Sequence, residues 1–461
     1  MTRRLIICND HSWTNRELRS GRRAVTGNAT LAHQCLMPEN RNGAPQIALL
    51  QNEKTDCSLI SAPLRRIFGT GIKSEILHAY EFLGRHYRPG DHIYLIGAGR
   101  GAYSLHCLAM LVARAGILTT DSLTSLQQAY LYSKLDDETR NAPAGQELRK
   151  KFTSQPARIR FLGLWDSLGH RGTPTLGMQR LSRLWSEDTP PTLCENVEKA
   201  YQALALDEDN PAYEAMIWAG TNSSDQKCLK SVEQVWFTGR HENIIGGRRD
   251  CRLSDIAFLW LVHKAEEEGL CFNHEKIDDL TNPNPLGQLY KRRTIGDLGR
   301  RLFKRRYVRA LGRADSHFTR QRIPDTEKIH ESVHTRRNQD HSYHPLALNA
   351  AASTTLPVAA AIEVRRQSHR RFRRMRVNCP ATLLVNAERY NGNLIDYSRG
   401  GARIWTPREL PVGTPITLRS ALLFDSGMEG HVVWSHDQSV GVEFAQELER
   451  NQLQQTQVRI H

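Results

Sequence analysis

Hydrophobic positions in the first part of the chain follow two alternating patterns. Short runs rich in branched and aromatic residues predict strands that are buried on both faces, at residues 4–8, 46–50, 92–96, 159–164 and 234–237. Between these runs apolar residues recur every three or four positions, which predicts helices over residues 73–86, 101–115, 123–134, 196–206 and 253–268. Strands alternating with helices predict a mostly parallel sheet with helices on both faces, whose ligands bind at the carboxyl ends of the strands.

The hydrophobic period changes to two towards the C-terminus. Short alternating runs, separated by turns rich in glycine, predict strands at residues 377–385, 392–395, 402–405, 416–418, 430–434 and 440–444. Short strands at this spacing are typical of a small antiparallel β-barrel. A polar helix is predicted over residues 446–457.

The two patterns divide a chain of 461 residues that is too long for one compact core. We predict a first domain over residues 1–348 and a linker rich in Ala, Thr and Ser over residues 349–364. The barrel domain follows over residues 365–446, and a helix and tail over residues 447–461 end the chain.

The composition is that of a globular protein, with 39% hydrophobic and 24% charged residues. No apolar run reaches the roughly eighteen residues that a membrane-spanning helix needs, and the apolar stretch near the N-terminus is too short for a signal peptide. The nine cysteines are scattered without a C-x-x-C spacing. We therefore predict a cytoplasmic protein with reduced thiols, no metal site and no cofactor.

The net charge of +14 is concentrated in two segments, residues 291–322 and residues 365–376. Such segments attract nucleic acid or anionic membranes. A solvated helix face explains the first segment equally well, and we do not expect a nucleic-acid partner. If DNA did bind there, its affinity would fall steeply with salt.

Two short motifs stand where the barrel begins. The first is an arginine pair in R-x-x-x-R spacing, Arg370 and Arg374, just before the first barrel strand. The second is a D-x-S-x-x-G sequence at the end of the next strand, formed by Asp396, Ser398 and Gly401. An arginine run alone is often a solvated arm, and Asp, Ser and Gly are common in turns. Both motifs in the right order within a six-strand pattern indicate a binding site.

The motifs and the strands over residues 370–444 together resemble the PilZ family, whose members bind the bacterial second messenger cyclic di-GMP. The resemblance implies that the residues of the two motifs bind the nucleotide, namely Arg370, Arg374, Asp396, Ser398 and Gly401. Arg371 is a further candidate because of its charge and proximity. Guanidinium groups pair in a fork with phosphate or with the guanine edge. A carboxylate such as Asp396 accepts hydrogen bonds from the guanine N1–H and amino groups.

A glycine-rich turn lies between a strand and a helix in the first domain. α/β-Hydrolases place their nucleophilic serine in such a turn as G-x-S-x-G. Here Gly97 and Gly101 match the outer positions, but Gly99 stands at the centre. Asp166 follows a later strand and His241 follows another, so the order of turn, acid and histidine is that of a hydrolase triad.

The segments around these residues, over residues 3–348, resemble an uncharacterised α/β-hydrolase family related to the catalytic domains of type VI secretion phospholipase effectors. The resemblance implies that Asp166 is the acid and His241 the base. Where the family has G-F-S-R-G-A, this chain has Gly99 in place of the serine. Its first loop, which begins at Asp10, lacks the glycine of the family's D-G-T-W start. Because glycine has no side chain, acyl transfer through position 99 is impossible.

Three interpretations of this domain remain open. It is a pseudohydrolase that serves as a scaffold, or it is a hydrolase that uses another serine, such as Ser104 or Ser12, or a base-activated water. In the third, Gly97-Ala-Gly-Arg-Gly101 is a dinucleotide-binding turn, although the G-x-G-x-x-G spacing is not met. His241 alone would more simply be a hydrogen-bonded loop residue.

We therefore predict a bacterial α/β-hydrolase-like domain followed by a PilZ β-barrel. In this hypothesis the barrel binds cyclic di-GMP and regulates a catalytically inactive scaffold domain with an unidentified protein partner. The ligand would order the self-repelling arm over residues 365–376. The alternative is a cyclic di-GMP-regulated lipase or esterase, phospholipase-like, with a non-standard nucleophile.

Overall fold

The chain divides into two compact units, residues 1–364 and residues 365–461, which are described separately. The computed structural model describes residues 2–11, 26–52, 70–168, 193–218, 231–290, 307–312, 326–349, 356–360, 375–386, 388–398, 400–408, 410–420, 424–436 and 438–446. None of the helices in these ranges is long and apolar enough to span a membrane.

The first unit is built on an eight-stranded sheet in the order β10-β9-β8-β7-β6-β3-β1-β2, with every neighbouring pair parallel. The strands are β1 (Arg4–His11), β2 (Gln46–Asn52), β3 (His92–Gly99), β6 (Ile159–Trp165), β7 (Lys199–Ala205), β8 (Ser231–Phe237), β9 (Glu327–His330) and β10 (Val358–Ala359). This confirms the predicted parallel sheet. The edge strand β10 lies within the range predicted as linker and was missed because it has only two residues.

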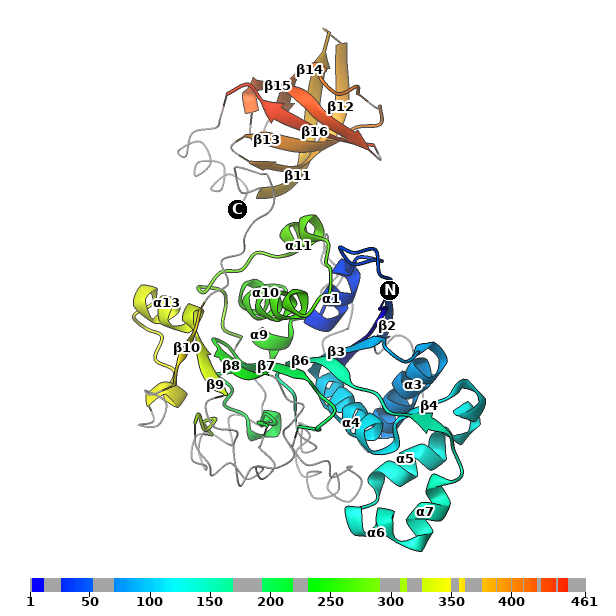
Figure 1. The fold of residues 1–461 in the computed structure, drawn as a ribbon. Coiled ribbons are helices and arrows are strands. Elements are labelled where there is room, and N and C mark those ends of the chain that lie inside the picture. Colours follow the sequence, from blue (N-terminus) through cyan, green and yellow to red (C-terminus); the bar gives the residue numbers. More distant parts are fainter. Residues whose placement is uncertain are drawn as a thin grey trace. The chain divides into compact units, whose positions relative to one another are not determined.

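Helices cover both faces of this sheet, as predicted (Figure 1). One face carries α3 (Thr70–His86) and α4 (Arg100–Ala115), and the other carries α1 (Asn28–Cys35) and α10 (Arg252–Glu267). The remaining helices of the unit are short: η1 (Thr120–Ser125), α5 (Leu126–Lys134), α6 (Asp137–Asn141), α7 (Pro143–Arg149), η2 (Pro211–Tyr213), α9 (His241–Ile245), α11 (His274–Leu280), α13 (Glu331–Gln339) and η4 (Leu346–Asn349). The two-residue strands β4 (Ile117–Leu118) and β5 (Ser154–Gln155) pair with each other beside η1 and α5–α7.

One predicted helix, over residues 196–206, was wrong, because this segment forms strand β7. Its alanines and widely spaced polar residues imitate a helical period, but all but its first residue are buried in the sheet. The polar Gln202 is tolerated inside because its side-chain amide donates to the carbonyl of Met216 at 2.9 Å. Burial in a central parallel strand thus overrides the helix propensity of alanine.

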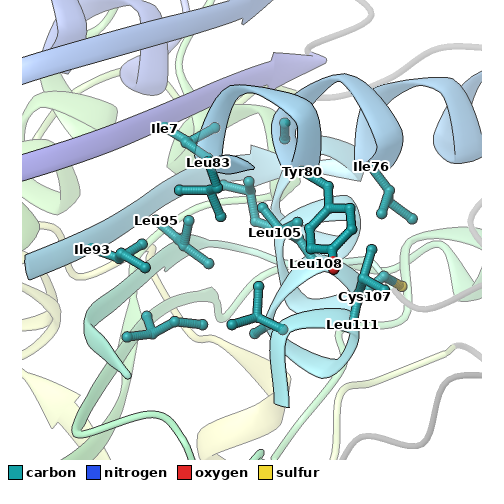
Figure 2. Close-up of a cluster of buried hydrophobic side chains, with 14 of the residues drawn as sticks. Ile7, Ile76, Tyr80, Leu83, Ile93, Leu95, Leu105, Cys107, Leu108 and Leu111 are labelled. Carbon is teal, nitrogen blue, oxygen red and sulfur yellow. The ribbon is translucent and has the colours of Figure 1, made fainter. Parts of the chain in front are cut away.

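The core between the sheet and α3 and α4 is a continuous apolar cluster (Figure 2). Tyr80 and Leu83 of α3 pack with Leu105 and Leu108 of α4 and with Leu95 of β3. The one polar group of this set is also satisfied, since the Tyr80 hydroxyl donates to the carbonyl of Gly116 at 2.7 Å. This packing fixes α4, and therefore the turn that precedes it, against the sheet.

The second unit is a closed antiparallel β-barrel, which confirms the predicted small barrel. Its strand order is β11-β12-β13-β16-β15-β14. Its strands are β11 (Met375–Val385), β12 (Glu388–Ser398), β13 (Gly401–Trp405), β14 (Pro415–Ser420), β15 (Phe424–His436) and β16 (Ser439–Phe444). Alternate residues fill the interior, among them Leu383, Leu394, Ile404 and Val442. The helix predicted over residues 446–457 lies, except for its first residue, outside the described residues.

Replacing Leu108 with alanine should lower the free energy of unfolding of the first unit by about 2–5 kcal/mol, because a fully buried side chain is lost and a cavity remains. Leu131→Ala on α5 is the matched control, since this leucine is 53% exposed and its loss should change stability by no more than about 0.5 kcal/mol. Urea unfolding of both variants measures the difference. Equal losses would contradict the core assignment.

Candidate functional site

The turn between β3 and α4 brings position 99 to the carboxyl edge of the sheet. Gly99 has φ +56° and ψ −114°, a conformation that strains any residue with a side chain. The flanking glycines are required by close packing. A Cβ on Gly97 would lie 2.8 Å from the Cα of Ala102, and one on Gly101 would lie 2.5 Å from the carbonyl oxygen of Asn9. The turn therefore has the sharp backbone geometry of a hydrolase elbow, with a strained central residue and closely packed glycines on both sides.

Asp166 lies directly after β6 in a left-handed conformation, with φ +43°. Its backbone N–H donates to the carbonyl of Ala203 at 2.7 Å, and its Oδ1 accepts from the N–H of Ala205 at 2.9 Å. Aspartate tolerates positive φ better than most residues, and here the two hydrogen bonds to β7 hold it there. Its carboxylate is completely buried.

His241 begins α9, just after β8, and its ring faces both Asp166 and Gly99. Its Nδ1 lies 2.6 Å from Oδ2 of Asp166. A Cβ placed on Gly99 would lie 3.2 Å from Nε2 and from Cε1 of the imidazole. The structure thus brings together the three residues that the sequence singled out. The imidazole also packs on the ring of Tyr213, with the ring centroids 5.0 Å apart.

Arg309 is the part of this site that the sequence did not predict. It lies in the basic segment over residues 291–322, where we considered a solvated helix face, but its side chain is only 2% exposed. Its guanidinium contacts both carboxylate oxygens of Asp166, at 2.5 Å and 3.0 Å. The solvated-face interpretation was therefore wrong for this residue. Neither spacing nor composition distinguishes it from its arginine neighbours.

The charges of the site shift the pKa values of its acids. Burial alone would raise the pKa of Asp166, but the Arg309 guanidinium and the hydrogen bonds from His241 and Arg309 hold it below its usual value. Glu208, in the loop after β7, accepts from the backbone N–H of His241 at 3.1 Å. Burial raises the pKa of Glu208, and the nearby Arg309 opposes this rise. Asp166 is therefore the ionised acid of the site.

Asp207 ties the loops after β7 and β8 to the end of the first unit. It accepts from the N–H of Gly239 at 2.7 Å and from the hydroxyl of Tyr343 at 2.8 Å. Burial raises the pKa of Asp207, while the hydrogen bonds from Tyr343 and Gly239 lower it. These contacts fix the backbone from which Glu208 and His241 project.

Ser104, one of the two alternative serines, forms its hydrogen bonds with groups other than Asp166 and His241. Ser104 is buried on α4, where its hydroxyl donates to the carbonyl of Gly101 at 2.9 Å and accepts from Nδ2 of Asn9 at 2.7 Å. It therefore ties the helix to β1, while Ser12 lies outside the described residues. Within the described ranges no three His, Cys, Asp or Glu side chains form a group that could hold a metal ion.

In the barrel, the D-x-S-x-x-G motif forms the hairpin between β12 and β13. Ser398 and Gly401 are register partners, and the Ser398 hydroxyl contacts the carbonyl of Gly401 at 3.3 Å. A Cβ on Gly401 would lie 2.3 Å from the carbonyl oxygen of Val442 on β16. Close strand packing therefore already requires glycine here, a reason that the sequence did not reveal.

Asp396 contacts Arg403, a residue that the D-x-S-x-x-G motif does not include. The register shifts between Leu394 and Asp396, and such a bulge re-aims the side chain that follows it. The Asp396 carboxylate is 3% exposed and lies 2.8 Å from Nε of Arg403, its cross-strand partner on β13. The predicted binding residues Arg370, Arg371 and Arg374 lie outside the described residues.

Comparison with known families matches both parts of the chain. Residues 3–264 match the family described as the catalytic domain of Tle1-like phospholipase effectors of type VI secretion systems. Residues 365–459 match the PilZ domain. Among curated proteins, the uncharacterised protein YEL023C of Saccharomyces cerevisiae is 29% identical over 117 residues, which make up 24% of this chain and 17% of the yeast protein. This chain thus spans less than a fifth of that relative.

Two solved structures resemble the two parts at low identity. The PilZ domain of CeSA from a cellulose-synthesizing bacterium is 17% identical, with a TM-score of 0.15, over 19% of this chain and 91% of that one. The Tle1 effector bound to the VgrG spike of the type 6 secretion system is 14% identical, with a TM-score of 0.30, over 54% of this chain and 51% of that one.

Gly99→Ala should destabilise the first unit more than Gly90→Ala does. Both glycines have positive φ, so each substitution strains the backbone by about 1–3 kcal/mol. Only the Cβ at position 99 meets the His241 ring, whereas a Cβ at position 90 has nothing within 4 Å. Urea unfolding of the two variants measures the added loss. If Gly90→Ala were equally or more destabilising, the imidazole would not be in contact with position 99.

Proposed function

The chain belongs to the family of Tle1-like phospholipase effector catalytic domains and carries a PilZ domain after it, and from this premise we propose that it is a cyclic di-GMP receptor whose hydrolase-like domain is catalytically inactive. In this proposal the barrel senses the nucleotide in the cytoplasm, and the first unit is the output, acting as a scaffold for a protein partner. The nucleotide is a signal rather than a cofactor.

The observation that carries the proposal is the hairpin of β12 and β13 in a closed barrel that matches the PilZ family. It holds the Asp396 carboxylate, the Ser398 hydroxyl and Gly401 within one turn. A carboxylate here accepts from a guanine edge, and a hydroxyl reaches phosphate or base. We assign Arg370, Arg371 and Arg374 to the phosphates and guanine faces, because guanidinium groups suit both.

The arm over residues 365–376 is the element that the ligand would change. It contains seven arginines within twelve residues, so it repels itself in the absence of an anion. Two phosphates would neutralise part of this charge and order the arm against the barrel. Because the arm begins the second unit, its ordering would alter the segment that connects it to the first unit.

The inactivity of the first unit is proposed from Gly99. The elbow keeps its conformation, but position 99 supplies neither an oxygen nor a sulfur for attack on an acyl group. Loss of a triad nucleophile leaves only the small residual catalysis of binding and oxyanion stabilisation. The unit would then contribute its surface rather than a reaction.

The second candidate function is a cyclic di-GMP-regulated lipase or esterase. The retained contact of 2.6 Å between Asp166 and His241 supports it, since a lost reaction places no constraint on this pair. In this alternative the imidazole would take a proton from water rather than from serine. That water would attack the ester carbonyl, and the proton would pass to the leaving alkoxide.

Calorimetric titration of the full chain with cyclic di-GMP tests the receptor proposal. We expect saturable binding that weakens about ten- to a hundredfold in Arg374→Ala and in Asp396→Asn, because each loses hydrogen bonds to or from a charged group. Arg389→Ala is the control, since Arg389 is an exposed arginine of the same barrel outside the motifs. Absence of binding by the wild-type chain, or an equal loss in the control, would contradict the proposal.

Ester hydrolysis separates the two candidate functions. The wild-type chain should not turn over acyl esters or phospholipids faster than His241→Ala, whereas Gly99→Ser should gain activity that the double variant Gly99→Ser/His241→Ala lacks. Rates with short acyl esters and with phospholipid vesicles, each with and without cyclic di-GMP, measure this. Turnover by the wild-type chain that disappears in His241→Ala would favour the enzyme.

A further inference from the structure

Asp166 and Arg309 form a buried ion pair beside the turn that carries Gly99. We infer that Arg309 is a positioning residue, which holds Asp166 ionised and fixed so that the His241 ring keeps its orientation toward Gly99. The inference rests on the acid and base roles proposed above for Asp166 and His241. No sequence motif assigns a role to this arginine, which lies 143 residues from Asp166.

The first argument is the hydrogen bonding of the carboxylate. Oδ1 of Asp166 accepts from the N–H of Ala205 at 2.9 Å and from Nη1 of Arg309 at 2.5 Å. Oδ2 lies 3.0 Å from Nη2 of Arg309 and 2.6 Å from Nδ1 of His241. A carboxylate has about four acceptor positions, and all four are filled. The carboxylate therefore cannot rotate without breaking at least one charge-assisted hydrogen bond.

The second argument is charge. An isolated ionised carboxylate is expensive to bury, and it becomes neutral unless a cation or several donors stabilise it. Of the described arginines and lysines, Arg309 is the one in ion-pair contact with Asp166. With the carboxylate ionised, Nδ1 of His241 must carry the hydrogen between them. In a neutral imidazole with its hydrogen on Nδ1, Nε2 is the acceptor nitrogen. Nε2 and Cε1 are the two ring atoms that face Gly99.

The third argument is how Arg309 is itself held. Nη1 also donates to the carbonyl of Ala205 at 2.9 Å, and Nη2 also donates to the carbonyl of Tyr213. These carbonyls belong to the end of β7 and to η2, so the guanidinium is fixed in place by backbone. Because the backbone fixes its position, Arg309 sets the orientation of Asp166 and not the reverse. It positions the acid and base without itself touching a reacting atom.

Among the described residues, the ionisable groups that act on the pair are His241, Glu208 and Tyr307. Burial raises the pKa of Tyr307 to about 12, and burial also raises the pKa of Glu208. In the wild-type chain the pKa of Asp166 lies below its value in the unfolded chain, which is about 3.9. The ionised Asp166 therefore stabilises the fold fully above about pH 3.9, and this contribution is constant between pH 5 and pH 8. Without Arg309, burial would raise that pKa above the unfolded value. The stability of such a variant would then fall as the pH rises through the new pKa.

The test compares Arg309→Met with Arg240→Met in the full chain. Arg240 pairs with Asp209 at 2.6 Å near the same edge of the sheet, but both side chains are partly exposed. In Arg309→Met we expect the folding equilibrium constant, relative to wild type, to be about tenfold lower at pH 8 than at pH 5, which requires the pKa of Asp166 in the variant to lie about two units above its unfolded value. In Arg240→Met the loss should be the same at both pH values. A pH-independent loss in Arg309→Met would overturn the inference.

Arg309→Lys keeps the charge without the fork and covers the case in which the methionine variant does not fold. Proton NMR of the chain with ¹⁵N-labelled histidine reports the Nδ1–H of His241 directly. We expect this resonance to shift in Arg309→Lys and to stay unchanged in Arg240→Met, and an unchanged resonance in Arg309→Lys would also overturn the inference. Titration with cyclic di-GMP is independent of both readouts, so failure of the receptor proposal would be seen separately.

Discussion

The carboxyl edge of the first sheet is organised around one buried negative charge. Asp166 receives hydrogen bonds from the next strand, from Arg309 and from the imidazole of His241. Because a buried carboxylate is stable only when it is fully paired, each of these partners is fixed in turn. The loops after β6, β7 and β8 therefore depend on this one buried charge for their positions.

The second constraint is close approach of backbone to backbone. Gly97 and Gly101 let the turn before α4 pass within contact distance of neighbouring main chain, and Gly401 does the same between β13 and β16. Two motifs that look like chemical signatures are therefore partly packing requirements. Close packing at these three glycines does not account for two other positions, namely residue 99 in the first unit and the Asp396–Ser398 stretch that precedes Gly401 in the barrel.

Much of the fold could be predicted from the sequence because its elements are strongly periodic. The barrel strands and the buried strands β1 and β3 are examples, whereas β7 was taken for a helix because burial in the sheet overrides alanine's preference. In the site, Asp166 and His241 could be found because each follows a strand in triad order. Arg309 could not, since its role depends on a contact with a residue 143 positions away and one arginine in a basic sequence resembles any other. Arg403 could not either, since its contact with Asp396 depends on the register of β12 and β13.

The elbow at Gly99 also has an evolutionary consequence. The glycine codons GGT and GGC each differ from a serine codon by a single base, so a chain encoded in that way lies one mutation away from a serine in a turn of the elbow shape. Here Asp166 and His241 are in contact beside the turn and Gly97 and Gly101 flank it, so a serine at position 99 would need no rebuilding of the fold.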